Sequence, residues 1–145
     1  MRDLDKAITL AGKIHKGQKD RYGASYILHP LRIMMKMETT EGKIVAILHD
    51  VVEDSDLTVQ DIENQGFEAA VSRAVDSLSR REGEKYDDYI ERVKDSPLAV
   101  LVKLADLEDN MDIRRAENVD DELFERLRKY HRAWKNLKQH LDSTK

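Results

Sequence analysis

The segment from His49 to Asp54 places four ionisable side chains directly after an apolar run. Residues 44–48 are all apolar, and His49, Asp50, Glu53 and Asp54 follow them. If this stretch is helical, His49 shares a face with Glu53 four residues on, and Asp50 shares the adjoining stripe with Asp54. Unpaired charges are costly to bury, and a bound cation would remove that cost. Imidazole together with carboxylate suits Mn²⁺, Fe²⁺ or Zn²⁺.

Two further places offer metal-ligating side chains at the edges of apolar segments. Asp106 follows the mostly apolar residues 101–105, and His29 precedes Pro30 where a loop is expected to enter a helix. The His49–Asp50 pair alone would fit an ordinary helix end with solvated charges equally well. Three separate places make a shared cation the better interpretation. Because the chain has no cysteine, nitrogen and oxygen must supply the ligands.

Helical periodicity dominates the elements that must position these residues, and strand-like alternation is rare. Glycine and proline are scarce, with six and two residues. The pattern predicts an all-α protein. The expected helices cover residues 3–16, 30–37, 42–53, a short stretch after a Thr58 N-cap, 67–78, 86–93, a stretch opened by Pro97, and 123–141.

Length and composition set further limits on the class of protein. The chain has 145 residues, of which 37% are charged and 40% hydrophobic, which suits one globular domain over residues 1–145. No apolar run reaches the roughly 20 residues of a membrane helix, so we expect a cytoplasmic protein that does not bind membranes. The net charge of −4 argues against nucleic-acid binding, but it allows a local basic pocket for a phosphorylated small molecule.

Four ordered motifs resemble the HD-superfamily metal-dependent phosphohydrolases. The resemblance is closest to the hydrolase domain of Rel/SpoT-type alarmone enzymes and to small stand-alone alarmone hydrolases, and it covers about residues 1–115. The motifs are His15-Lys16-Gly17-Gln18, Tyr26-Ile27-Leu28-His29-Pro30, Leu48-His49-Asp50-Val51-Val52-Glu53-Asp54, and Val102-Lys103-Leu104-Ala105-Asp106 with Asn110 four residues on.

This resemblance implies a fold, a metal site and a reaction. The fold would be a single compact HD-domain-like helical bundle. The reaction would remove pyrophosphate from the 3′ position of a guanosine alarmone of the stringent response, converting ppGpp to GDP and pyrophosphate. One metal ion, typically manganese, would be held by His29, His49, Asp50 and Asp106. Glu53 and Asp54 would be catalytic acids beside it, and Asn110 would lie near the sugar.

The chemistry of phosphoryl transfer assigns roles to other residues. A metal can withdraw charge from phosphorus and acidify water, and Glu53 or Asp54 would accept the proton of that water. Positive charge must also meet the developing negative oxygens. We expect Lys16, Lys19, Arg21 and Lys103 to supply it.

Two positions depart from the family pattern and leave the substrate open. The alarmone hydrolases carry a base-stacking arginine where this chain has Asp20, and commonly a threonine where it has Ile113. One alternative is therefore an HD phosphohydrolase for an adenosine alarmone, a nucleoside monophosphate or a phosphorylated dinucleotide. Another is a non-catalytic regulator that binds an alarmone or a protein. The sequence leaves the oligomeric state open.

Overall fold

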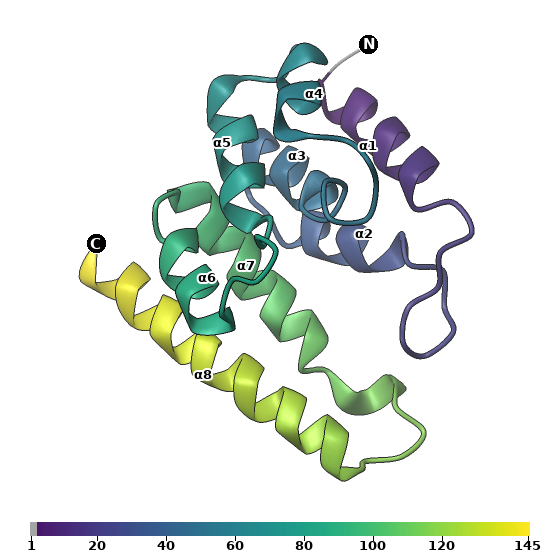
Figure 1. Cartoon of the computed structure of the whole chain (residues 1–145), viewed down its shortest axis with the longest axis vertical. Helices are drawn as coiled ribbons and strands as arrows, with labels where there is room; N and C mark the ends of the chain where they lie inside the picture. The colour runs from purple at the N-terminus through teal and green to yellow at the C-terminus, as the bar shows by residue number, and fades with distance from the viewer. Residues whose placement is uncertain (1–2) are drawn as a thin grey trace.

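The computed structural model describes residues 3–145 and confirms the all-α prediction. Residues 1–2 of the expected domain lie outside the described part. The helices are α1 (Asp3–Ile14), α2 (Leu28–Met35), α3 (Thr40–Leu48), α4 (Val59–Asn64), α5 (Ala69–Leu78), α6 (Tyr86–Val93), α7 (Pro97–Asn110), the 3₁₀ helix η1 (Ile113–Arg115) and α8 (Asp121–Ser143) (Figure 1). Within this range β-pairing is limited to one isolated bridge between Lys19 and Ser25.

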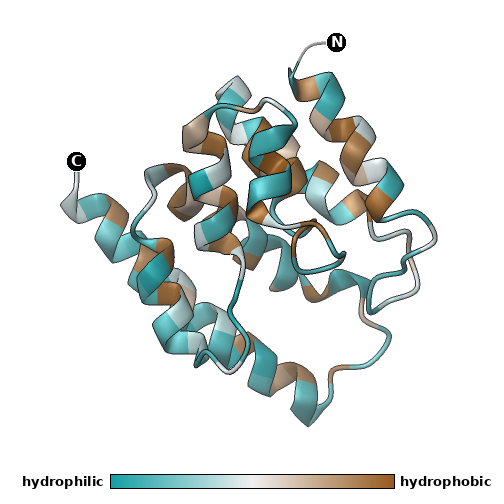
Figure 2. Cartoon of the chain, turned by 45° about the horizontal axis from the view of Figure 1, so that its top comes forward, coloured by the Kyte–Doolittle hydropathy of each residue, from teal (hydrophilic) through white to brown (hydrophobic). Residues whose placement is uncertain are grey.

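The helix α3 lies at the centre of the core. It packs against α1, α2, α5 and α7, and α8 lies along α6 and α7. Residues 44–48 of α3 are buried, as are residues 102–107 of α7. Hydrophobic residues therefore gather in the bundle around α3, while α8 is largely hydrophilic (Figure 2). No helix between residues 3 and 145 is both long enough and apolar enough to cross a membrane.

Local capping signals fix where several helices begin. The Thr58 side chain accepts a hydrogen bond from the Asp61 N–H, and the Asp61 side chain accepts one from the Thr58 N–H, so α4 opens with a capping box. Ser96 caps α7, and Pro97 occupies its first turn. The Asp120 side chain caps α8. The starts of α4 and α7 agree with the sequence prediction, whereas α8 begins at Asp121, before its predicted start at residue 123.

The predicted end of α3 at Glu53 is wrong, because this helix stops at Leu48. The carbonyl of Ala46 accepts hydrogen bonds from the backbone N–H of His49 (3.4 Å) and from its ring Nδ1 (2.6 Å). These bonds take the place of the helical bond from Asp50, and the chain continues in turns through residue 54. The predicted stripes joining His49 with Glu53 and Asp50 with Asp54 are therefore not formed on one helix.

The second helix begins before its predicted start at Pro30. It starts at Leu28, so His29 lies in its first turn and is buried. Proline is tolerated there because the first turn needs no N–H donor from that residue. This start places His29 and Arg32 three residues apart on one helix, facing α7.

Candidate metal centre and nucleotide cleft

A cleft of about 390 Å³ opens between α2, α7, α8 and the loop that follows α1. Basic, acidic and aromatic side chains line it together. The lining residues are Gln18, Lys19, Asp20, Arg21, Tyr22, Tyr26, His29, Arg32, Asp50, Glu53, Arg80, Tyr86, Tyr89, Lys103, Asp106, Asp109, Asn110, Arg115, Arg126, Lys129 and Tyr130.

The four predicted metal ligands lie close together at the inner end of this cleft, which His29, Asp50 and Asp106 line, while the buried His49 lies beside Asp50 and Asp106. His29 comes from α2, His49 and Asp50 follow α3, and Asp106 comes from α7. One ligand atom of His29, one of His49 and one of Asp50 lie within 4.8 Å of one another. Asp106 is not part of this group of three, but its Oδ1 lies 2.8 Å from His29 Nε2 and 3.5 Å from His49 Nε2. Three helices thus gather side chains that are up to 77 residues apart in sequence.

The hydrogen bonds of the two histidines leave their Nε2 atoms directed at this cluster. His49 Nδ1 donates to the Ala46 carbonyl, and His29 Nδ1 donates to Asp109 Oδ2 at 2.6 Å. A neutral imidazole that donates from Nδ1 has its lone pair on Nε2. His49 Nε2 is buried and makes no hydrogen bond, although Asp50 Oδ2 lies 3.0 Å away. This buried nitrogen beside carboxylate oxygens fits a bound divalent cation.

Electrostatics in the cluster favour charged carboxylates. Burial alone would raise the pKa of Asp106, but the charge of Lys103 and the nearby rings of His29 and His49 lower it well below its usual value. Burial would likewise raise the pKa of Asp50, and the positive charge of the adjacent His49 ring, when protonated, lowers it to about 2. The Tyr26 hydroxyl donates a hydrogen bond to Asp50. The carboxylates are thus ionised at neutral pH, as metal ligation requires.

His29 is oriented by a carboxylate that sequence reasoning missed. Asp109 is buried on α7, and its Oδ1 and Oδ2 accept hydrogen bonds from Arg32 Nε (2.8 Å) and Nη2 (2.9 Å). Burial would raise the pKa of Asp109, but the bonds from His29 and Arg32 lower it strongly. A signal existed in the spacing. Asp106 and Asp109 are three residues apart on α7, as His29 and Arg32 are on α2, so each pair shares a face.

The two predicted catalytic acids occupy different places. Glu53 lines the cleft, and its Oε1 accepts a hydrogen bond from the Arg80 N–H at 2.5 Å. Partial burial raises the pKa of Glu53, and the Arg80 N–H opposes this while the charge of Asp50 adds to it. Asp54 is not among the lining residues, and its Oδ2 accepts from Gln18 Nε2 at 3.1 Å. The geometry therefore favours Glu53 over Asp54 as the acid that reaches a substrate.

The four predicted substrate-binding residues all line the cleft, but they divide into two pairs. Lys103 Nζ lies 2.8 Å from Asp106 Oδ2, and Asn110 Nδ2 donates to Asp106 Oδ1 at 3.3 Å. This pair therefore also holds a metal-ligand candidate in place. Lys19 and Arg21 are exposed and form no ion pair within the described chain. Lys16 is not a lining residue.

Further cations face the cleft from the C-terminal part of the chain. Arg126 and Lys129 come from α8, Arg115 from η1, and Arg80 from the loop after α5. Burial lowers the pKa of Lys129, and the positive charges of Arg80 and Lys103 lower it further. Mutual repulsion of this kind indicates a surface that would be stabilised by an anion.

Comparisons with known proteins agree with this fold and site. No protein-family model matches the chain. Guanosine-3′,5′-bis(diphosphate) 3′-pyrophosphohydrolase of Aquifex aeolicus is 30% identical over 121 residues, covering 75% of this chain and 17% of the relative. The MESH1 enzyme of the same name from Danio rerio is 34% identical over 116 residues, covering 71% of this chain and 64% of the relative.

One solved structure has the same fold over nearly the whole chain. It belongs to a metazoan orthologue of SpoT that hydrolyses ppGpp, with a TM-score of 0.73, 23% identity, and coverage of 99% of this chain and 93% of the other. The chain spans only 17% of the length of the first relatives, such as that from Aquifex aeolicus. We identify the chain as an HD-type relative of the Rel/SpoT-like ppGpp hydrolases, which confirms the resemblance predicted from the motifs.

Proposed function

We propose that the protein is a manganese-dependent cytoplasmic phosphohydrolase that converts ppGpp to GDP and pyrophosphate. The observation that carries the proposal is the buried imidazole–carboxylate cluster at the inner end of a cleft lined by cations. The names of the relatives support the same reaction. The relatives' activity is carried over because the ligand motifs and the fold occur together in this chain.

The metal in this proposal is held by His29, His49, Asp50 and Asp106. When bound, a divalent cation supplies Lewis-acid stabilisation of phosphate oxygens and makes the attacking water more acidic. Manganese is compatible with a mixed set of nitrogen and oxygen donors. The carboxylates are already ionised, so displacing protons from the two histidines is the main cost of binding at neutral pH.

Glu53 acts as the proton acceptor in this reaction. The water oxygen loses a proton to Glu53 and forms a bond to the phosphorus attached to the 3′-oxygen, the bond from that phosphorus to the 3′-oxygen breaks, and the 3′-oxygen takes up the proton that Glu53 accepted. A raised pKa makes Glu53 a stronger base than an ordinary surface carboxylate. Asp54 positions Gln18 at the start of the cleft loop. Asn110 binds near the sugar, and Lys103 holds Asp106 in place.

The exposed cations bind the remaining phosphates. Lys19 and Arg21 reach the cleft from the loop after α1, and Arg126 and Lys129 reach it from α8. A nucleotide with phosphates at both its 3′ and 5′ positions presents negative charge at two ends. This arrangement matches a cluster that holds one phosphate group and a basic rim that meets the other.

Pyrophosphate release tests the proposal directly. The purified protein is treated with a chelator, and Mn²⁺ and ppGpp are then added while pyrophosphate and GDP are measured. We expect turnover only after metal is restored, and a loss of about 100-fold or more in kcat for Glu53→Gln. Absence of turnover with any nucleotide 3′-pyrophosphate across several divalent metals would reject the proposal.

A second candidate function keeps the chemistry and changes the base. The position of the family's stacking arginine is Asp20, whose Oδ1 accepts hydrogen bonds from the Tyr22 and Ala24 N–H groups at 2.9 Å each. This carboxylate therefore has a structural task in the loop. A panel of guanosine, adenosine and dinucleotide substrates separates the two candidates, because a preference for a compound without guanine would favour the second.

A further inference from the structure

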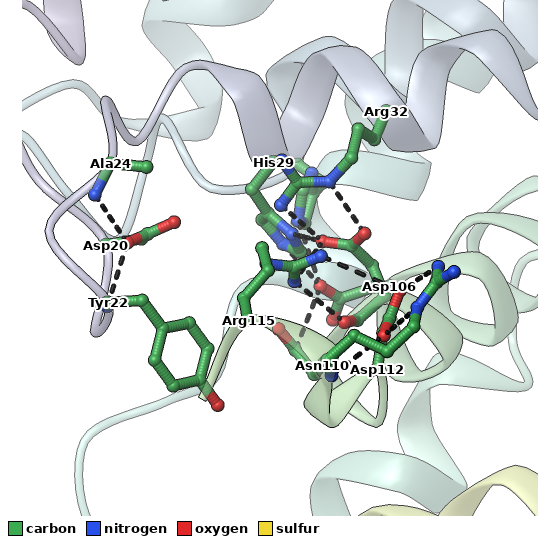
Figure 3. A network of polar contacts seen from close by, with 12 residues as sticks. Asp20, Tyr22, Ala24, His29, Arg32, Asp106, Asn110, Asp112 and Arg115 are labelled. Atoms are coloured by element: carbon green, nitrogen blue, oxygen red, sulfur yellow. Dashed lines mark hydrogen bonds and ion pairs between the residues drawn. The ribbon is translucent and has the colours of Figure 1, made fainter. Parts of the chain in front are cut away.

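Tyr22 sits at the tip of an ordered loop that forms one wall of the cleft. The loop closes on itself through the bridge between Lys19 and Ser25, and the Asp20 N–H donates to the Ala24 carbonyl at 2.8 Å. Gly23 supplies the positive φ of 89° that the turn requires. The Asp20 carboxylate secures the loop from inside (Figure 3). The backbone that carries Tyr22 is thus held in place before any ligand binds.

Arg115 belongs to the 3₁₀ helix η1, which follows α7, and it lies near the Tyr22 ring. Its guanidinium carbon lies 6.0 Å from the centroid of that ring. Arg115 is anchored by Nη2, which donates to the Asp109 carbonyl at 3.2 Å. Both residues line the cleft, and each is about one-third exposed, with 36% for Tyr22 and 30% for the Arg115 side chain.

The other cleft tyrosines are already engaged. Tyr26 donates its hydroxyl to Asp50 and packs against the rings of His15 and His29. Tyr89 is buried, and its hydroxyl donates to the Leu78 carbonyl. Tyr86 and Tyr130 both lie under the ammonium group of Lys129, at 4.7 Å and 5.3 Å. Tyr22 is therefore the cleft aromatic, among the described residues, whose ring is most open to a ligand.

We propose that Tyr22 and Arg115 form a stacking platform for the nucleobase of the substrate. This inference rests on the proposed function, and it names the base-recognition residues of that same site. An aromatic ring and a guanidinium plane both stack on bases, and such stacking tolerates different bases. A base inserted between two planes needs about 7 Å, twice the roughly 3.4 Å spacing of stacked bases. The guanidinium carbon of Arg115 now lies 6.0 Å from the Tyr22 ring centroid, so the Tyr22 side chain, which is 36% exposed, turns outward to admit a base.

Asp109 connects this platform to the metal end. Its carboxylate binds His29 Nδ1, and its carbonyl binds Arg115. One residue of α7 therefore sets both the orientation of a metal-ligand candidate and the place of a base-stacking cation. This shared anchor fixes the distance between the reacting phosphate and the base. It also explains how a chain with Asp20 in the loop keeps an arginine beside the base.

Binding measurements with and without a base test the platform. The Mn²⁺-loaded protein is titrated with GDP and, separately, with inorganic pyrophosphate, which has no base. We expect Tyr22→Leu to weaken GDP binding by about 10-fold or more and to change pyrophosphate binding less than twofold. Tyr22→Phe restores the ring and should recover most of the lost GDP affinity. Arg115→Lys keeps the charge but loses the plane, and should weaken GDP binding by about 3- to 10-fold.

The matched control is Phe124→Leu, which removes an exposed aromatic ring outside the cleft. It should leave GDP affinity unchanged. Equal GDP affinity in Tyr22→Leu and wild type, with both folded by circular dichroism, would overturn the platform. Hydrolysis of ppGpp in that case would leave the proposed function intact. If instead Tyr22→Leu loses affinity for GDP but not for pyrophosphate, and the wild-type protein hydrolyses no nucleotide 3′-pyrophosphate, the platform is supported and the proposed function is refuted.

Discussion

The inner end and the mouth of the cleft treat charge in opposite ways. At the inner end His29, His49 and Asp106 are at most 7% exposed, and each polar group faces a partner of complementary charge. At the mouth Lys19, Arg21 and Arg126 carry charge that no carboxylate of the described chain neutralises. The proposed function therefore places a divalent cation at the inner end. It places the phosphates of the substrate at the mouth.

The largest predicted effect comes from breaking the inner end. Asp50→Asn keeps the shape of the side chain but removes a charge beside His49 Nε2. We expect more than a 100-fold loss of both Mn²⁺ affinity and kcat/KM, beyond the range found for residues that only support a ligand. Calorimetric titration and pyrophosphate release measure the two quantities. Asp56→Asn, an exposed position in the following turn, is the control and should match wild type.

A smaller effect should follow when the support of His29 is weakened. Asp109→Asn removes the charge that holds both His29 Nδ1 and Arg32. We expect Mn²⁺ affinity to fall by about 10- to 100-fold, since the imidazole becomes a weaker and less well oriented ligand. Glu108→Gln is the control, because the Glu108 carboxylate, one residue before Asp109, accepts a hydrogen bond from Trp134 on α8. Unchanged Mn²⁺ affinity in Asp109→Asn would show that the pair only stabilises the fold.

The mouth should respond differently from the inner end. Lys129→Met removes one cation from the rim, and we expect KM to rise by about 5- to 10-fold with little change in kcat. The increase should shrink in high salt, because exposed charges are screened. Steady-state kinetics at two ionic strengths measure this. Lys138→Met, further along α8 beside Asp142, is the control. A fall in kcat as large as that for Asp50→Asn would contradict the division between the two ends.

The smallest effect concerns the loop that carries Arg80. Glu84 accepts hydrogen bonds from Arg92 and the Arg81 N–H, and these lower its pKa from 4.5 to about 2. A lowered pKa in the folded state stabilises above pH 4.5, and that contribution is lost as pH falls toward 2. We expect Glu84→Gln to lower Tm by roughly 1–3 °C at pH 7.

The difference in Tm between wild type and Glu84→Gln should narrow when the melts are repeated from pH 5 down to pH 2. Glu125→Gln, at an exposed position of α8, serves as the control and should show no such trend. A difference that stays constant down to pH 2 would mean that the carboxylate charge contributes nothing to the loop.

Some helix boundaries can be predicted from the sequence, and others depend on contacts formed only in the folded protein. Thr58 and Pro97 predict the starts of α4 and α7, because capping and the first-turn preference of proline are local interactions. The end of α3 is not visible, because it depends on a bond between the His49 ring and a carbonyl three residues earlier. Periodicity alone continues a helix through that point.

The site divides in the same way. The motifs predict which side chains form the inner end of the cleft. Their distances from one another depend on how the helices pack. Pairing of Arg32 with Asp109 had a local signal in the three-residue spacing on both helices. The approach of Arg115 to Tyr22 had none, since 93 residues separate a loop tip from a 3₁₀ helix and only the tertiary fold joins them.

Anomalous scattering from a crystal soaked in Mn²⁺ tests the central claim most directly. We predict a single strong peak at the inner end of the cleft, with His29 Nε2, His49 Nε2, Asp50 and Asp106 all at roughly 2.0–2.3 Å from it. A peak at another group of carboxylates, or none while the four side chains keep their mutual hydrogen bonds, would contradict the account.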